Sequence, residues 1–392
     1  MKKLVLFGAG KIGRSFIGQL FAQSGYEVVF IDIDEKVINE LNSKKQYKVV
    51  IKSNGPDRTI LVQHVRGVQG THKDKVVSEL VSCDIAAVSV GQRGLTAITP
   101  VLAKAITKRK NNALQPLDII IAENMRNADE FILNSMNQYV QEDFPLKDWV
   151  GLVETSIGKM VPIMPEDEVQ NDPLLVYAEP YNTLIVDGNA FKNSIPDVKG
   201  LAPKDNIKAW VDRKSYIHNF GHAAVAYAGY AYHSFQKYIY EALENPAVKS
   251  FAIKAMNQSA AILRAKYPEE FSEKDLEEHI NDLIARFENK ALKDTIYRVG
   301  CDLKRKLSSS DRIISPMLDG LYFDLPVDYI MLVFAFGFCF EAKDEQGKRL
   351  ISDEDFSKLL QEKGIKNTLK KVLMLDAKEI MDSIAVVSFK AI

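Results

Sequence analysis

The sequence predicts a two-domain α/β protein, with a doubly wound parallel sheet in the first domain and mainly α-helices in the second. In the first half, short apolar runs alternate with helical patterns, an order typical of a parallel sheet with helices on both faces. From about Lys204 onward, apolar residues recur instead with a helical period of about 3.6. The polar stretch Lys192–Lys204, which contains glycine and proline, marks the boundary. We therefore expect domains at residues 1–195 and 196–392.

The first strand is expected at Leu4–Phe7, an apolar run that ends at Gly8. Apolar residues at helical spacing predict a helix over Ile12–Gln23, and a crossover segment is expected over Leu95–Ile106. Because proline is tolerated in the first turn of a helix and disfavoured in its interior, the crossover helix should begin near Pro100. The other strands expected are Glu27–Ile33, Ile60–Val65, Ile85–Val90, Ile119–Ala122 and Val150–Val153, with a helix over Lys36–Asn42.

The second half is predicted to be helical. Its longest apolar stretch, Tyr329–Phe340, is about a dozen residues, whereas a membrane-spanning helix needs about 20. We therefore expect a buried core helix there and no membrane span. The helices expected are Ile207–Val211, Ala223–Leu243, Ala247–Lys266, Glu273–Phe287, Val327–Phe340 and Asp353–Gly364.

Charge and cysteine content limit the class of protein. The formal net charge of −1 argues against a nucleic-acid partner, because a protein that neutralises many phosphates usually carries a basic excess. The three cysteines, Cys83, Cys301 and Cys339, are far apart and indicate neither a metal-ligand pair nor a disulfide framework. The apolar start runs straight into glycines and is interpreted as a strand, not a signal peptide. We expect a cytoplasmic protein that is a monomer or a small homo-oligomer.

A glycine motif opens the chain. Gly8-x-Gly10-x-x-Gly13 follows the first strand and begins the first helix, so that bare backbone and a helix N-terminus can approach a pyrophosphate. Asp32 ends the second strand, where an acid hydrogen-bonds a ribose hydroxyl and favours NAD over NADP. Arg14 could contact a phosphate, although a helix-surface arginine fits equally well. The expected NAD-binding residues are Gly8, Ala9, Gly10, Lys11, Ile12, Gly13 and Asp32.

A second motif carries the chemistry. On a helix, Asn219 lies ~140° and His222 ~80° round from Lys214, so the three side chains share one broad arc. Oxidation of an alcohol needs a base for the hydroxyl proton. The scattered cysteines, and His218 and His222 without a metalloprotease context, argue against a zinc ion. No Tyr-x-x-x-Lys pair is present. These observations favour a metal-independent dehydrogenase with a lysine base.

Lys214, Asn219 and His222 match the Lys-x-x-x-x-Asn-x-x-His pattern, and the chain resembles the polyol-specific long-chain dehydrogenases. Within that family it is most similar to the bacterial mannitol-1-phosphate 5-dehydrogenase group. The resemblance extends over nearly the whole length and consists of a series of motifs in order. These motifs are Gly8–Arg14, Glu123–Met125, Asn171–Leu174, Ile185–Asp187, Arg213–His222, Arg286–Asn289, Arg298–Gly300 and Arg305–Arg312.

The resemblance implies a Rossmann-like N-terminal domain, a helical C-terminal domain, and NAD-dependent interconversion of D-mannitol 1-phosphate and D-fructose 6-phosphate. It implies that Lys214 is the general acid/base and that Asn219 and Asn124 form an oxyanion hole, as two amide donors can. His222 would orient substrate hydroxyls. Arg298 and Lys306 would contact the substrate, and which cation binds phosphate stays open.

The sequence departs from the family pattern at two places. Gly158 and Lys159 stand where the family usually has an acid and an arginine, and Cys301 stands where close relatives tend to have arginine. A free-polyol mannitol 2-dehydrogenase or a hexuronate reductase is therefore an alternative. A catalytically silent NAD(H)-binding regulator is a further alternative, which the intact Lys214 motif disfavours. Asn219 could instead cap a helix, and His222 could be a core histidine.

Overall fold

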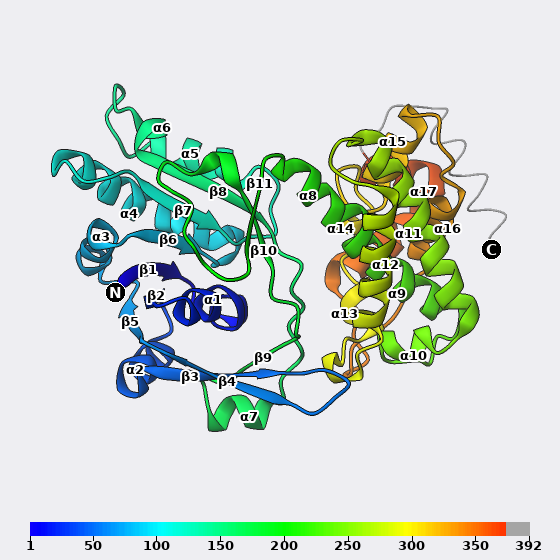
Figure 1. Cartoon of the computed structure of the whole chain (residues 1–392). Helices are drawn as coiled ribbons and strands as arrows, with labels where there is room; N and C mark the ends of the chain where they lie inside the picture. The colour runs from blue at the N-terminus through cyan, green and yellow to red at the C-terminus, as the bar shows by residue number, and fades with distance from the viewer. Residues whose placement is uncertain (374–392) are drawn as a thin grey trace. The chain divides into compact units, whose positions relative to one another are not determined.

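The computed structural model describes residues 1–373, which fall into two compact units, Met1–Val211 and the chain from Asp212 onward (Figure 1). This division lies later than the expected boundary after residue 195. The physical reason is that β11 (Leu201–Lys204) pairs in parallel with β10 (Leu184–Asp187) and extends the first unit's sheet. The polar stretch interpreted as a linker therefore ends in a strand.

The N-terminal unit is built on an eight-stranded sheet in the order β11-β10-β8-β7-β6-β1-β2-β5. The six strands from β5 to β8 are all parallel and have the strand order of a dinucleotide-binding fold. The expected Rossmann-like fold is thus confirmed. Besides β10 and β11, the strands are β1 (Lys2–Phe7), β2 (Tyr26–Asp32), β5 (Val65–Gln69), β6 (Ile85–Val88), β7 (Leu117–Ile121) and β8 (Val150–Ser156).

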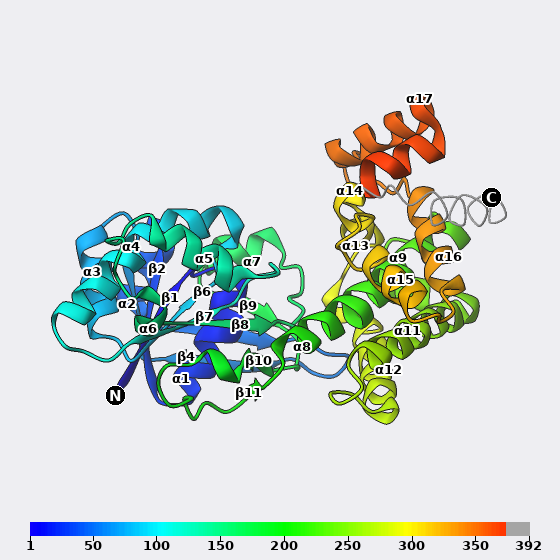
Figure 2. The same ribbon diagram turned by 90° about the horizontal axis from the view of Figure 1, so that it is seen from above.

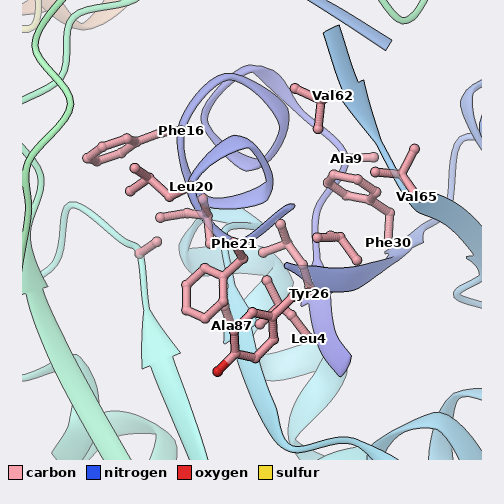
Figure 3. Packing of buried hydrophobic residues seen from close by; sticks show 14 of the residues in the cluster. Leu4, Ala9, Phe16, Leu20, Phe21, Tyr26, Phe30, Val62, Val65 and Ala87 are labelled. Carbon is pink, nitrogen blue, oxygen red and sulfur yellow. The ribbon is translucent and has the colours of Figure 1, made fainter. Parts of the chain in front are cut away.

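Helices cover both faces of this sheet. Side chains alternate between the two faces of each strand, so each face has its own core. Leu4 and Leu6 face one core, and Val5 and Phe7 face the other. Figure 3 shows the first core, where the ring of Phe21 packs edge-on against that of Tyr26 on β2. The helices and 3₁₀ turn of this unit are η1 (Gly13–Gly18, a π-helix), α1 (Gln19–Gln23), α2 (Glu35–Lys44), α3 (Lys73–Ser82), α4 (Gly91–Asn111), α5 (Ala128–Asn137), α6 (Leu146–Trp149), α7 (Glu166–Asn171) and η2 (Gly188–Ala190).

A second, three-stranded sheet joins β4 (Arg58–Gln63), β3 (Gln46–Ile51) and β9 (Val176–Ala178). The single strand expected over Ile60–Val65 is wrong, because His64 adopts a left-handed backbone with φ of 59°. The chain turns there and passes from β4 of the small sheet into β5 of the large one. β3 was not anticipated.

The crossover helix α4 begins at Gly91 and not near Pro100, so that expectation is wrong. Pro100 lacks the N–H that would bond to the carbonyl of Thr96 four residues earlier. The hydroxyl of Thr99 donates to that same carbonyl at 2.9 Å and replaces the missing bond. A neighbouring side chain thus allows the proline inside the helix.

The C-terminal unit is helical, as expected, and α9 (Phe220–Tyr232) packs against α10, α11, α13 and α16 (Figure 1). Within this unit α14 lies beside α17 (Figure 2). Among residues 1–373, no helix is both long and apolar enough to cross a membrane. The division between the two units falls within α8 (Ile207–Arg213). The other elements of the C-terminal unit are η3 (Lys214–Asn219, a π-helix), α10 (Ile239–Leu243), α11 (Pro246–Lys266), α12 (Glu273–Phe287), η4 (Lys290–Leu292), α13 (Ile296–Gly300), α14 (Leu303–Lys306), α15 (Ile314–Tyr322), α16 (Asp328–Phe338) and α17 (Ile351–Leu373).

The expected helix Glu273–Phe287 is confirmed as α12, whose N-terminal Ser272 and Asp275 form a capping box. The single helix expected over Ala223–Leu243 is wrong, because the chain leaves the helix after Tyr232. Residues 233–238 form a turn that ends in a β-bridge between Tyr238 and Thr295.

Candidate active site

The glycine motif forms a turn of bare backbone at the carboxyl end of β1. Gly8 has φ of +94°, and a Cβ there would lie 2.1 Å from the carbonyl oxygen of Ser89, at the end of the adjacent β6. A Cβ on Gly13 would lie 2.0 Å from the carbonyl oxygen of Gly8. Side chains are thus sterically excluded at both positions. Gly10 has open space around it and is exposed, as is Lys11.

The two apolar residues of the motif belong to the hydrophobic core. Ala9 is buried and Ile12 packs against the core, while the helix that begins at Lys11 passes into the π-helix η1. Parallel sheets bind ligands at the carboxyl ends of their strands, where the strand order reverses. Here the reversal falls between β1 and β6, where the Gly8 turn lies. The Gly8–Gly13 segment therefore has the geometry of a pyrophosphate cradle.

Asp32 lies directly beside this cradle. Its Oδ2 accepts a hydrogen bond of 2.6 Å from the N–H of Ala9, and its Oδ1 accepts one of 3.0 Å from the N–H of Asp34. The carboxylate is partly buried. It therefore stands in a fixed position next to the turn, where a ribose hydroxyl could reach it.

Arg14 is buried and is not on the helix surface. Its Nη1 donates to the carbonyl oxygen of Pro173 at 2.6 Å, and burial lowers the pKa of the guanidinium. This arginine connects the first helix to the segment before β9.

Asn124 is exposed in the turn that follows β7, at the carboxyl edge of the sheet. The turn is held by its neighbour Glu123, whose Oε1 accepts from the N–H of Val90 at 2.6 Å and of Gly91 at 2.8 Å. Burial raises the pKa of Glu123. Glu123 thus fixes the Glu-Asn-Met turn to the N-terminus of α4, a role that the sequence did not reveal.

In the C-terminal unit, Lys214 begins the π-helix η3, which ends at Asn219. A π-turn is wider than an α-turn and is bonded from i to i+5, so residues five apart lie closer in rotation than the ~140° expected for an α-helix. The turn is anchored by its buried Tyr216, whose carbonyl oxygen accepts from the hydroxyl of Ser259 at 2.7 Å. Single π-turns occur frequently at functional sites.

The ammonium group of Lys214 lies in a partly buried, cationic environment. Burial, and secondarily the charge of Arg312, lower the pKa of Lys214 to about 8. A lysine near this pKa can both release and accept a proton near neutral pH. The arrangement therefore supplies an acid/base at the start of the motif.

Asn219 continues the helix and does not cap it. Its backbone is α-helical, and its side chain makes no capping hydrogen bond to the helix that follows. Its carbonyl oxygen lies 3.5 Å from Nη1 of Arg312. The helix-cap interpretation is thus wrong, and Arg312 is a neighbour that sequence reasoning placed only in a general basic segment.

His222 is held in one ring plane. It stacks on Phe287 with ring centroids 4.5 Å apart and an interplanar angle of 7°. Burial lowers its pKa well below the usual value, and the nearby charges of several cations lower it further, so the imidazole is neutral. The cations near enough to act on His222 are Arg298, Arg312, Lys306 and Arg286.

Arg298 and Lys306, the expected substrate contacts, differ in environment. The Arg298 side chain is half-exposed and forms an ion pair with buried Asp294. Lys306 is buried, and its Nζ donates to the carbonyl oxygens of Val299, at 2.6 Å, and Cys301. Burial and the charge of Arg312 lower the pKa of Lys306 to about 8.

The structure also places the two departures from the family pattern. Lys159 is buried in the N-terminal unit, where its Nζ donates to the carbonyl oxygen of Tyr181 at 2.7 Å and to Oδ1 of Asn182 at 2.9 Å. Gly158 lies near the Tyr181 ring with room for a Cβ. Cys301 contributes its carbonyl oxygen to Lys306. Within residues 1–373, no group of three His, Cys, Asp or Glu side chains is placed to hold a metal ion.

Family models match both halves of the chain. The mannitol dehydrogenase Rossmann domain matches residues 2–200, and the mannitol dehydrogenase C-terminal domain matches residues 206–389. The chain is 33% identical to mannitol-1-phosphate 5-dehydrogenase of Streptococcus mutans serotype c, over 98% of both chains.

Two solved structures share the fold. D-sorbitol dehydrogenase in its substrate-free form has a TM-score of 0.80 at 16% identity, over 98% of this chain and 91% of that one. Mannitol 2-dehydrogenase of Pseudomonas fluorescens, in a ternary complex with NAD and D-mannitol, has a TM-score of 0.73 at 13% identity, over 100% and 91%. The chain therefore belongs to the mannitol dehydrogenase family of polyol oxidoreductases, as the motif from Lys214 to His222 predicted.

Proposed function

We propose that this protein is an NAD-dependent dehydrogenase that interconverts D-mannitol 1-phosphate and D-fructose 6-phosphate without a metal ion. Lys214 is the general acid/base, Asn219 and Asn124 are the oxyanion donors, and His222 orients substrate hydroxyls. Family membership and the similarity to the Streptococcus mutans enzyme support this reaction class. The individual roles rest on the local geometry of each side chain.

The residues of the glycine turn fit a dinucleotide. The steric exclusion of side chains at Gly8 and Gly13 leaves backbone N–H groups at a helix N-terminus for a pyrophosphate. The fixed carboxylate of Asp32 suits the two hydroxyls of an adenosine ribose and repels a 2′-phosphate, which favours NAD. NAD(H), when bound, supplies or accepts the hydride. Gly10 and Lys11, which are exposed, form the outer corner of the cradle.

Lys214 donates and accepts the proton of the reaction. In the direction of ketose reduction its ammonium group gives a proton to the oxygen of the former carbonyl, and in alcohol oxidation its neutral amine takes the hydroxyl proton. The pKa of about 8 makes both forms accessible near neutral pH. The amide N–H groups of Asn219 and Asn124 are suited to the negative charge that develops on that oxygen.

The observation that favours a phosphate ester over a free polyol is the set of four cations whose charges act on neutral His222. Arg298, Lys306, Arg312 and Arg286 belong to this set. Three of the four already pair with acids of the protein, Arg298 with Asp294, Arg312 with Asp311 and Arg286 with Asp282. A phosphate can in addition pair with arginine bidentately and with lysine, whereas an uncharged polyol offers these cations no charge. A hexuronate carboxylate would also satisfy some of them, so it is the alternative substrate class to test.

The test is NADH oxidation, followed by absorbance, with fructose 6-phosphate, free fructose and fructuronate in parallel. We expect kcat/KM for the phosphate ester to exceed both others by at least about tenfold, because one charge-assisted hydrogen bond contributes about 1.5–3 kcal/mol. A preference for fructose would assign a free-polyol enzyme, and a preference for fructuronate a hexuronate reductase. NADH binding without turnover of any of the three ketoses would contradict the proposal.

A further inference from the structure

The C-terminal unit contains a pair of buried polar atoms that face each other. Nε2 of His222 and Oδ2 of Asp294 are 3.5 Å apart. Both atoms are shielded from solvent, and neither has a hydrogen-bond partner among the described residues. Leaving two such groups unsatisfied is unfavourable by about 1–3 kcal/mol each. Such an arrangement in a native site calls for a functional explanation.

The other oxygen of the same carboxylate is engaged. Oδ1 of Asp294 accepts from Nη2 of Arg298, one helical turn further along. A single buried carboxylate therefore stands between the histidine expected to meet substrate hydroxyls and an arginine expected to meet the substrate. Burial raises the pKa of Asp294 and the charge of Arg298 opposes that rise.

The backbone around Asp294 is fixed on both sides. Its own carbonyl oxygen accepts from the N–H of Ile239 at 2.9 Å, and the N–H of Ile296 donates to the carbonyl oxygen of Lys237 at 2.8 Å. Thr295 caps the helix that carries Arg298. Lys237 of the turn that interrupts the expected long helix, and Ile239 directly after that turn, thus fix the backbone that carries Asp294.

The imidazole of His222 has little freedom besides its tautomer. Stacking on Phe287 fixes the ring plane, and the neutral ring carries one proton, on either Nδ1 or Nε2. A carboxylate beside Nε2 favours the proton on Nε2 and leaves Nδ1 as the acceptor nitrogen. An acceptor at Nδ1 can receive the hydrogen of a substrate hydroxyl group.

We infer that Asp294 is a positioning residue that holds His222 in the Nε2–H tautomer and Arg298 in its binding orientation. The functional consequence rests on the proposed function. One carboxylate positions both the histidine that binds substrate hydroxyls and the arginine that binds the anionic group of the substrate. Asp294 itself contacts neither substrate nor cofactor in this scheme. Its removal should therefore act through His222 and Arg298.

The first test needs no substrate. The six histidines can be labelled with ¹⁵N, and the His222 signals identified by their loss in a His222→Gln variant. We expect the Nε2–H tautomer in the wild-type protein and a shift toward Nδ1–H in Asp294→Asn. A wild-type His222 in the Nδ1–H tautomer would overturn the inference, whatever ketose the enzyme reduces and whether or not the Asp294 variant folds.

The second test is a double-mutant cycle on kcat/KM with the ketose that is reduced best. Loss of a residue that orients a functional group typically lowers activity about 10- to 100-fold, and we expect that loss in Asp294→Asn. In Asp294→Asn combined with His222→Gln, the loss should be smaller than the product of the two single losses, because the part of the Asp294 effect that acts through His222 is already lost. Losses that multiply, or wild-type kcat/KM in Asp294→Asn, would overturn the inference.

The matched control is Glu273→Gln, which removes the acid of the exposed Arg264–Glu273 pair in the same unit. It should leave kcat/KM and the His222 tautomer unchanged. The two tests also separate this inference from the proposed function. Failure to reduce fructose 6-phosphate would contradict the proposed substrate, while the tautomer of His222 would still decide the role of Asp294.

Discussion

The N–H of Ala9 and the Oδ2 of Asp32 are joined by a hydrogen bond of 2.6 Å. This contact makes the glycine turn and the expected ribose-binding acid parts of one structure, although they are 23 residues apart in the chain. It connects the carboxyl ends of β1 and β2, which are adjacent parallel strands. A change at Asp32 should therefore affect both the choice of cofactor and the shape of the cradle.

Two substitutions separate these effects. Asp32→Ala removes both the charge and the acceptor for Ala9, whereas Asp32→Asn removes only the charge. We expect both variants to lose discrimination against NADP, because neither repels its 2′-phosphate. KM for NAD should rise more in Asp32→Ala. Steady-state kinetics with both cofactors measure this, and an unchanged preference in both variants would exclude Asp32 from the ribose site.

The glycine turn gives a second prediction. Gly8→Ala should lower the unfolding temperature by several degrees, because strain at a positive φ costs about 1–3 kcal/mol and the new Cβ meets the carbonyl of Ser89. Gly10→Ala has open space and should leave the unfolding temperature nearly unchanged while it weakens NADH binding. Thermal unfolding and NADH titration measure both. Normal NADH affinity in Gly10→Ala would contradict close approach of the cofactor at this corner.

The parts of the fold that could be predicted are those with a local signal. The apolar run Leu4–Phe7, the glycines after it and the helical spacing of the apolar residues that follow placed β1, the turn and the first helix correctly. Pro100 misled the prediction, because the compensating hydroxyl of Thr99 has no signature of its own. His64 likewise gave no warning that its backbone would turn left-handed.

The candidate site divides in the same way. The spacing of Lys214, Asn219 and His222 is visible in the sequence. The π-turn, which reduces the rotation between Lys214 and Asn219 about the helix axis, is not. Asp294 and Arg312 approach the motif only through tertiary packing, from helices and turns far along the chain. No local pattern could have singled them out from the other charged residues nearby.

Lys214 gives the third prediction, on pH. Lys214→Ala should lower kcat by about 10²- to 10⁴-fold, the usual contribution of general acid/base catalysis, while NADH binding survives. In the wild type, ketose reduction needs the ammonium form, so its kcat/KM should fall as pH rises through about 8. Alcohol oxidation needs the neutral amine and should rise through the same range. Near-normal turnover in Lys214→Ala would remove the lysine from this role.

The unfolding temperature of a second variant, Lys214→Met, shows whether Lys214 also has a structural role. The folded state lowers the pKa of Lys214 below its unfolded value of about 10.4, so the unfolded chain binds more protons between pH 8 and 10.4. By linkage, the contribution of Lys214 to the free energy of unfolding increases with pH across that window and is unfavourable below it. Lys214→Met, which keeps the volume without the charge, should therefore unfold at or above the wild-type temperature at pH 7. A lower temperature would show a structural role.

Arg312 gives the fourth prediction, because its charge acts on Lys214 and Lys306 and its guanidinium lies beside Asn219. In Arg312→Gln the pKa of Lys214 should rise, so that the fall of ketose reduction and the rise of alcohol oxidation both move to higher pH. If Arg312 also contacts the phosphate, kcat/KM for fructose 6-phosphate should drop roughly 10- to 100-fold, with little change for free fructose.

Arg305→Gln is the matched control, since exposed Arg305 pairs with Asp302 and Asp311 and does not act on Lys214. A pH profile that moves in neither variant would show that the low pKa of Lys214 comes from its burial alone, and a profile that moves equally in both would assign the effect to the net charge of the segment.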